Sequence, residues 1–180
     1  RKINMTEANL PPEFKFKTTD DLIRVGRNFD GGYLVSRADA EATDFIIGLG
    51  INDDWSFEEN FRTLKRVNVL AYDASVGQQF FIKSILKSAL RPWRLKRLSQ
   101  SVRNFVDYQL FFLQRGVRHL KKFVGFDSIN TLPNNNHFVF MSSVFESVDY
   151  ENIFLKIDIE GSEYRILETL IKYEYRISGL

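Results

Sequence analysis

Two carboxylates, Asp158 and Glu160, stand two positions apart directly after the mostly apolar run at residues 153–157. Successive side chains of an extended chain alternate between its two faces, so both carboxylates point to the same side. A carboxylate placed there can take a proton from a hydroxyl group as a general base, and two carboxylates on one face can bind Mg²⁺. We favour proton transfer over a magnesium site, with Asp158 as the base.

A second group of candidate ligand-binding residues follows an apolar run at residues 44–51. Gly48 and Gly50 lack a Cβ and so allow the backbone to approach a ligand closely. The third glycine of the dinucleotide fingerprint is absent, and the acids Asp53 and Asp54 would repel a pyrophosphate. The loop therefore argues against NAD or FAD, and it tolerates a ligand that carries positive charge.

Asp73 ends the next apolar run, at residues 67–72, about 20 to 25 residues after the glycine loop. An acid at this position is placed to accept hydrogen bonds from a ribose diol. The alternative is that Asp73 only caps the helix that follows it. We favour the ribose role, which together with the glycine loop indicates a nucleoside without phosphates. S-adenosylmethionine, which carries a ribose, an ammonium and a sulfonium, fits that description.

The elements that position these residues follow a strand, loop, helix, strand order, which predicts a βαβ unit with a right-handed crossover. Its helix spans residues 56–66, with Ser56 as the cap and Glu58 and Glu59 at the positive end. Before it, residues 20–36 predict a hairpin or flap around a turn at residues 30–32. After it come two helices, from residue 82 to a break at Pro92 and from about Leu95 to Gly116.

The last part of the chain predicts a strand and short helix at residues 137–148, a strand at 153–157 and a helix ending near Tyr173. Residues 177–180 read as the opening of another strand. A parallel sheet of this kind would need more strands to cover the last helix, so we expect a C-terminal part that is truncated at Leu180.

Three segments resemble the FkbM-type S-adenosylmethionine-dependent methyltransferases: GLGINDDWSFEENF at residues 48–61, AYDAS at 71–75 and LKIDIEGSEYRILETL at 155–170. The chain is most similar to a subgroup with a DWSFE-like first loop and an upstream RVGRNFDGGYLV, here residues 24–35. The resemblance covers about residues 20–75 and 137–180. It implies an α/β, Rossmann-like methyltransferase fold, with a mostly parallel sheet flanked by helices, and O-methylation of a hydroxyl on a sugar, glycan or natural product.

The resemblance also assigns site residues. It places Gly48, Leu49 and Gly50 along the methionine part of the cofactor and Asp73 on the ribose. We also expect cofactor contacts from Asn52, where many relatives have a further glycine, and from Ala74. Asp158, Glu160 and Glu163 would form the edge of the active site. For Glu163, the favourable place of an acid at a helix N-terminus is an equally good explanation.

Charge is distributed unevenly along the chain. The net charge is only +2, yet eleven Lys or Arg and a single acid, Asp107, fall between residues 83 and 122. This basic helical insertion, at about residues 76–122, could bind an anionic acceptor, membrane headgroups or nucleic acid. No nucleic-acid motif is present. We therefore expect the insertion either to cover the acceptor site or to make peripheral contact with a membrane surface. The flanking segments, residues 1–43, 44–75 and 123–180, complete a single domain.

Composition narrows the remaining options. The absence of cysteine excludes thiolate metal sites and disulfides and fits a reducing compartment. No apolar stretch approaches the roughly 18 residues that span a bilayer, and no signal peptide is recognisable, so we expect a cytoplasmic protein. His119 and His137 have no metal-ligand spacing, and we expect structural or surface roles for them. Trp55, Phe57 and Phe61 should lie in the core, and for Tyr33 we favour simple packing over contact with substrate.

Two other classes of function remain open on the sequence. One is a non-catalytic Rossmann-like module that binds an anionic partner or a membrane surface through its basic helices. The other is an enzyme that uses a nucleotide sugar or a dinucleotide on the same fold. Binding of S-adenosylhomocysteine separates both from a methyltransferase.

Overall fold

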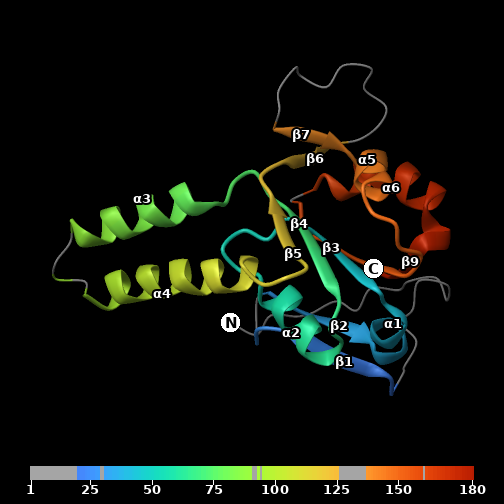
Figure 1. The fold of residues 1–180 in the computed structure, drawn as a ribbon, viewed down its shortest axis with the longest axis horizontal. Helices are drawn as coiled ribbons and strands as arrows, with labels where there is room; N and C mark the ends of the chain where they lie inside the picture. Colours follow the sequence, from blue (N-terminus) through green and yellow to red (C-terminus); the bar gives the residue numbers. More distant parts are fainter. Residues whose placement is uncertain (1–19, 29–30, 91–92, 94, 126–136, 160) are drawn as a thin grey trace, which may run out of the picture.

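The computed structural model describes residues 20–28, 31–90, 93, 95–125, 137–159 and 161–180. Its centre is a parallel sheet of five strands in the order β5-β4-β3-β8-β9 (Figure 1). These strands are β3 (Phe45–Leu49), β4 (Asn68–Tyr72), β5 (Val117–Leu120), β8 (Ile153–Ile157) and β9 (Ile177–Gly179). Numbered by their sequence order within the sheet, they run 3-2-1-4-5, which is the order of a doubly wound, Rossmann-like sheet. The predicted α/β class with a parallel sheet is confirmed.

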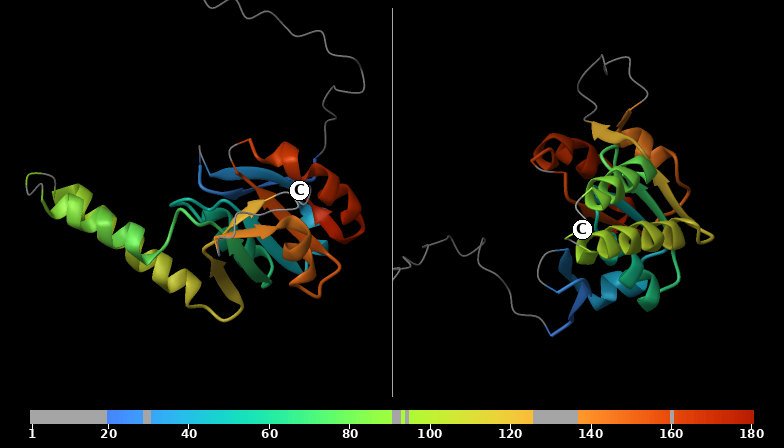
Figure 2. Two further views of the ribbon diagram at one scale, coloured as in Figure 1. Left: turned by 90° about the horizontal axis from the view of Figure 1, so that it is seen from above. Right: turned by 90° about the vertical axis from the view of Figure 1, so that its left-hand side faces the viewer.

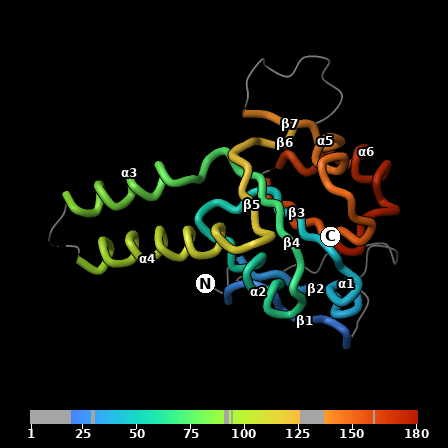
Figure 3. Tube along the Cα trace, in the orientation of Figure 1, coloured from blue at the N-terminus to red at the C-terminus, as the bar shows by residue number. Residues whose placement is uncertain are grey.

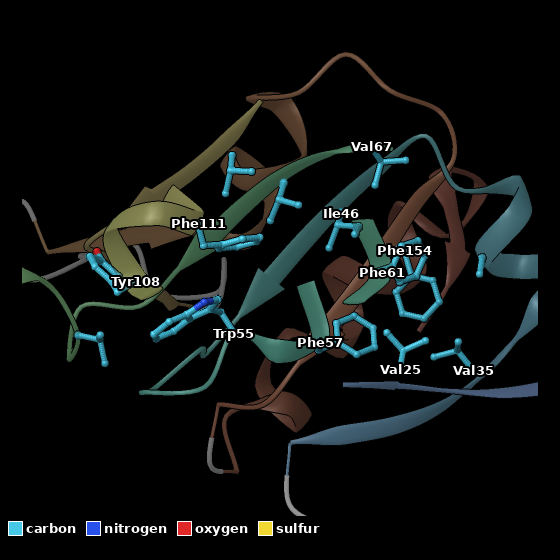
Figure 4. Close-up of a cluster of buried hydrophobic side chains, with 14 of the residues drawn as sticks. Val25, Val35, Ile46, Trp55, Phe57, Phe61, Val67, Tyr108, Phe111 and Phe154 are labelled. Carbon is cyan, nitrogen blue, oxygen red and sulfur yellow. The ribbon is translucent and has the colours of Figure 1, made fainter. Parts of the chain in front are cut away.

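One face of the sheet is covered by α2 (Ser56–Leu64) and by the antiparallel hairpin of β1 (Leu22–Gly26) and β2 (Gly32–Ser36). The core on this side is rich in aromatic rings, among them Trp55, Phe57, Phe61 and Phe154 (Figure 4). The short helix α1 (Arg37–Ala42) links β2 to β3, with Ser36 capping its first turn by accepting a hydrogen bond of 3.2 Å from the amide of Asp39. The flap hairpin and the buried aromatic residues were predicted correctly.

The other face is covered by α5 (Met141–Glu146) and α6 (Glu163–Lys172), which precede the 3-10 helix η3 (Glu174–Arg176). Every residue of β3 is buried, because helices cover both sides of it. Beside this core, β6 (Phe123–Gly125) and β7 (Phe138–Phe140) form a separate parallel pair. β7, α5, β8, α6 and β9 all lie where the sequence predicts them.

The helices α3 (Gln78–Ala89) and α4 (Leu95–Phe112) form an antiparallel hairpin that projects away from the sheet (Figures 1, 2 and 3). Only its base reaches the core, through Phe81, Tyr108 and Phe111. The basic stretch is not wholly helical, because it also contains β5, an outer strand of the sheet. α4 ends at Phe112, four residues before the left-handed Gly116, which instead ends the turn into β5.

The start of α2 differs from the prediction in its cap. Ser56 makes no side-chain cap; its amide donates to Oδ1 of Asp54 at 2.9 Å, and its hydroxyl accepts from the amide of Arg27 at 3.0 Å. Ser56 therefore ties the flap to α2, and Asp54 takes over the capping role. None of the helices in the described ranges is long and apolar enough to cross a membrane.

Candidate functional site

The chain crosses from one half of the sheet to the other between β3 and β8, and ligands of open α/β sheets bind beyond the strand ends at such a point. The loop after β3 packs directly on the end of β8, where the amide of Asp158 donates to the carbonyl of Leu49 at 2.8 Å. Gly50 has a φ of +75°, and a Cβ there would lie only 1.9 Å from the carbonyl oxygen of Asp158. Glycine is therefore required at position 50.

A cavity of about 280 Å³ opens at this edge of the sheet. Its size is near the lower end for ligand pockets, about 300 Å³. The wall combines loop residues after β3, β4 and β8 with the start of β6. The residues are Gly50, Asn52, Tyr72, Asp73, Ser75, Lys122, Phe123, Val124, Asp158 and Ile159. Four site residues predicted from sequence, Gly50, Asn52, Asp73 and Asp158, are thus brought together.

The carboxylate of Asp73 organises the loops around this cavity. Oδ2 accepts from the amides of Ile51 at 3.0 Å and Asn52 at 2.8 Å, and Oδ1 accepts from the amide and hydroxyl of Ser75 at 2.7 and 2.5 Å. Burial raises the pKa of Asp73, but the hydrogen bonds from Ser75, Asn52 and Ile51 outweigh it and leave the pKa below its usual value. Asp73 is thus a charged anchor between two loops. It does not cap α3, which begins at Gln78 after Gly77 and has no side-chain cap.

Asp158 meets a residue of the flap. The hydroxyl of Tyr33 donates to Oδ2 of Asp158 at 3.0 Å. The Tyr33 ring packs edge-on against Phe57, with 5.6 Å between centroids, which fixes its direction. The sequence favoured simple packing of Tyr33 over contact with substrate. In the structure its ring packs on Phe57, and its hydroxyl also reaches Asp158.

Lys156 and Glu58 are site residues that the sequence analysis missed. Lys156 is 7% exposed within β8, donates to the carbonyl of Gly50 at 2.7 Å, and lies 5.8 Å from the Tyr33 ring centroid. A lysine two positions before Asp158 inside an apolar run was the available signal, because a buried ammonium needs a partner.

Glu58 is fully buried in the first turn of α2, and neither carboxyl oxygen has a hydrogen-bond partner among the described residues. It packs against Gly48, where a Cβ would lie 2.5 Å from its Oε1. Burial raises the pKa of Glu58, and the positive charge of Lys156 counteracts this only in part. Burial behind the glycine loop therefore shifts the equilibrium of Glu58 toward its protonated, neutral form.

The remaining predicted residues lie in different places. Gly48 is buried within β3 beneath Glu58, and the Leu49 side chain belongs to the core on the other face. Neither lines the cavity, because both precede the strand end. Ala74 is half-buried in the loop after Asp73. Glu160 lies outside the described residues.

Glu163 lies in the first turn of α6, where its Oε1 accepts from the amide of Ile159 at 2.9 Å. Hydrogen bonds from the backbone, its own amide first, lower the pKa of Glu163. The carboxylate thus closes the loop between β8 and α6, as expected for an acid at a helix N-terminus.

His119 contacts the backbone of Asp73 at the end of β4. Its Nδ1 lies 2.7 Å from the Tyr108 hydroxyl and its Nε2 2.9 Å from the carbonyl oxygen of Asp73. Burial lowers the pKa of His119, so the neutral ring is favoured, with Nε2–H donating and Nδ1 accepting. The predicted structural role is confirmed: His119 links α4, β5 and the end of β4.

A second, mostly apolar cavity of about 270 Å³ lies between the flap, β8 and α6. It is lined by Tyr33, Leu34, Val35, Phe57, Phe154, Leu155, Lys156, Ile157, Glu163, Leu167, Leu170 and Leu180. The Tyr33–Asp158 hydrogen bond joins a residue of this cavity to a residue of the first. The two cavities are therefore linked through the Asp158 carboxylate, which lines the first, and the Tyr33 hydroxyl, whose residue lines the second.

The described residues contain no group of three or more His, Asp or Glu side chains arranged to hold a metal ion. Comparison with protein-family models, with curated proteins and with solved structures found no match. Function must therefore be argued from the site.

Proposed function

We propose that the protein is an S-adenosylmethionine-dependent O-methyltransferase that acts on a hydroxyl of a sugar, glycan or natural product. One observation carries the proposal: Gly50, Asp73 and Asp158, from the ends of three neighbouring strands, line one cavity at the crossing point of the sheet. A nucleoside ligand needs an acid for its ribose and a nearby reactive group, which Asp73 and Asp158 supply. Gly50 lets the first loop approach the end of β8 closely, which brings these two acids to one cavity.

The chemistry of the lining residues suits this cofactor. Asp73 would hold the ribose, with Ser75 as the exchangeable partner that a sugar hydroxyl can replace. Phe123 and Val124 supply apolar surface for a base, and Asp158 supplies negative charge for a sulfonium. Lys122 brings a cation that can pair with a carboxylate of the ligand. The absence of a glycine-rich phosphate cradle fits a cofactor without phosphates.

Bound S-adenosylmethionine supplies an electrophilic methyl group on a positively charged sulfur. Methyl transfer to the acceptor hydroxyl oxygen would form a carbon–oxygen bond as the carbon–sulfur bond breaks, and the bonding pair would leave on sulfur. Asp158 accepts the hydroxyl proton, and Tyr33 orients its carboxylate. The hydrogen bond from Lys156 to the carbonyl of Gly50 holds the first loop against β8. A fixed loop would hold the methyl donor and the acceptor in position, and such positioning supplies much of the rate.

The second cavity favours one kind of acceptor within the proposed class. Its walls are mostly aliphatic and aromatic, with Tyr33, Lys156 and Glu163 as the polar exceptions. An acceptor with an apolar body would lie there and direct its hydroxyl toward Asp158. We therefore place natural-product alcohols and phenols ahead of sugars.

Calorimetric titration with S-adenosylhomocysteine tests the proposal. We expect saturable binding that is weakened at least about tenfold by Asp73→Ala, through loss of the ribose partner and of loop order. Asp53→Ala is the matched control, since Asp53 is an exposed acid of the first loop, and it should bind normally. Absence of saturable binding, or equal affinity in Asp73→Ala, would refute the proposed cofactor.

The base is tested separately with Asp158→Asn, by measuring release of S-adenosylhomocysteine against a panel of alcohols, phenols and sugars. Turnover should be lost while binding of S-adenosylhomocysteine persists. Turnover close to that of the wild type would remove Asp158 from the proton-transfer role.

A further inference from the structure

The α3–α4 hairpin exposes many large apolar side chains along a part of the molecule that packs on nothing else described. Leu86 is 59% exposed, Leu90 80% and Trp93 76%. Phe80 and Leu110 are also exposed, nearer the base of the hairpin. Farther out, the remaining exposed apolar residues are Ile82, Leu95, Val102 and Val106. The left view in Figure 2 shows the hairpin projecting clear of the sheet and its covering helices.

These apolar residues gather on one side of the hairpin. With 3.6 residues per turn, Ile82, Leu86 and Leu90 form one row along α3, and Leu95, Val102 and Val106 form one row along α4. A polar cavity marks the opposite side of both helices, lined by Ser84, Lys87, Ser88, Arg97, Ser101 and Asn104. On each helix the mean direction of the apolar row lies roughly 150° from the mean direction of the residues of that cavity. The two rows thus form one apolar face.

Cations border this face. By the same spacing, Lys83 lies beside the α3 row, and Lys96 and Arg103 lie beside the α4 row. Between residues 78 and 113 the sequence holds seven Lys or Arg and a single acid, Asp107. Trp93 is exposed at the tip, between the two rows, and tryptophan is enriched where a protein meets the headgroup region of a bilayer.

The face is not the packing surface of the hairpin. α3 and α4 contact each other through Ser84, Ser88 and Ser101, whose hydroxyls lie 3.1 to 3.3 Å apart, and they join the main core through Phe81, Tyr108 and Phe111. The hairpin therefore has its internal contacts and its anchor without burying the apolar rows. An outside partner is needed to cover them.

We propose that this apolar face docks on the surface of an anionic lipid bilayer, with both helices lying in the interface and the flanking cations at the lipid phosphates. An apolar face bordered by Lys and Arg, with a Trp at its end, is the arrangement that binds such a surface. A second copy of the chain would fit less well, because it would bring the same cations against those of the first.

Sedimentation with vesicles of phosphatidylcholine, with and without phosphatidylserine, tests the proposal. We expect binding to the anionic vesicles that weakens with salt. The double change Leu86→Glu and Val106→Glu should reduce binding at least about tenfold, because it places charge within the apolar face. Leu64→Glu is the matched control, an equally exposed leucine on α2, and should bind like the wild type.

Intrinsic fluorescence gives a second measurement. Trp55 is buried and Trp93 exposed, so a blue shift on addition of anionic vesicles should be present in the wild type and absent in Trp93→Phe. Equal binding of the double variant and the wild type, or no binding to anionic vesicles, would overturn the proposal. So would a dimer on gel filtration that the double variant dissociates, since the face would then be an interface between copies.

Discussion

The hydroxyl of Tyr33 lies 3.0 Å from Oδ2 of Asp158, across 125 residues of chain. This hydrogen bond connects the tip of the flap hairpin to the end of β8, and so joins a residue of each of the two cavities. The flap is itself fixed to the first loop, because Arg27 pairs with Asp54 at 3.5 Å and its amide donates to Ser56. The flap is therefore part of the site and not only a cover for the sheet.

Tyr33→Phe removes the hydroxyl and keeps the ring that packs on Phe57. Loss of one hydrogen bond to a carboxylate costs about 1.5 kcal/mol, so we expect turnover to fall about tenfold with little change in affinity for S-adenosylhomocysteine. Initial rates and calorimetry on the same preparation measure the two effects. An unchanged rate would mean that Tyr33 does not orient Asp158.

Gly50→Ala and Gly161→Ala separate backbone strain from steric collision. Both glycines have positive φ, +75° and +88°, but a Cβ at Gly161 meets nothing within 4 Å, whereas at Gly50 it meets the carbonyl of Asp158. We expect the free energy of unfolding to fall by about 1 to 2 kcal/mol for Gly161→Ala and by about 3 kcal/mol or more for Gly50→Ala. Denaturant titration measures both, and equal losses would argue against the close approach of β3 and β8.

Glu58→Gln should stabilise the protein at neutral pH. The folded pKa of Glu58 is raised, so above about pH 4.5 the unfolded chain releases a proton that the folded state keeps, and stability falls as pH rises toward the folded pKa. Glutamine does not ionise, so it removes this decrease, and it should raise the free energy of unfolding by about 1 kcal/mol or more at pH 7. Urea unfolding from pH 4 to pH 8 measures the free energy of unfolding of the variant and of the wild type, starting near the ordinary pKa of a glutamate.

Glu59→Gln is the control for this change, since Glu59 is the exposed neighbour in the same turn and should leave the pH profile unaltered. If Glu58→Gln proved less stable than the wild type at pH 7, Glu58 would instead be an ionised residue with a partner.

His119 should make the protein less stable as pH falls, the opposite of the effect of Glu58. Its folded pKa is lowered, so below about pH 6.5 the unfolded chain takes up a proton that the folded state excludes. The free energy of unfolding should therefore decrease as pH falls from about 6.5 toward the folded pKa. His119→Gln should lose about 1 to 2 kcal/mol at pH 7.5 and flatten the profile. His137→Gln changes the exposed histidine, and its profile should follow the wild type.

The inner strands of the sheet were predictable because strands covered on both faces consist of continuous apolar runs. β3 and β8 illustrate this, since their burial leaves almost no room for polar side chains. β5 was not predicted, because it is an outer strand in which Arg118 and His119 interrupt the apolar pattern, and it lies in a stretch dominated by basic helices.

The site was predictable only where a residue's position along a strand decides its role. Gly50, Asp73 and Asp158 follow strand ends, so topology alone brings them together. The burial of Glu58 was not predictable, because an acid in the first turn of a helix normally faces solvent. The choice of Asp54 over Ser56 as the cap of α2 depends on the flap, which occupies the Ser56 hydroxyl.

The anchoring of the α3–α4 hairpin at its base implies a gradient of local stability along its length. Amides near Phe81 and Tyr108 can exchange with deuterium only when the main core opens, whereas those near Ala89 and Leu95 need only local fraying of two helix ends. The outer turns can thus melt and reform without disturbing the sheet. The exposed apolar residues of the hairpin thus lie in turns that can rearrange independently of the described core.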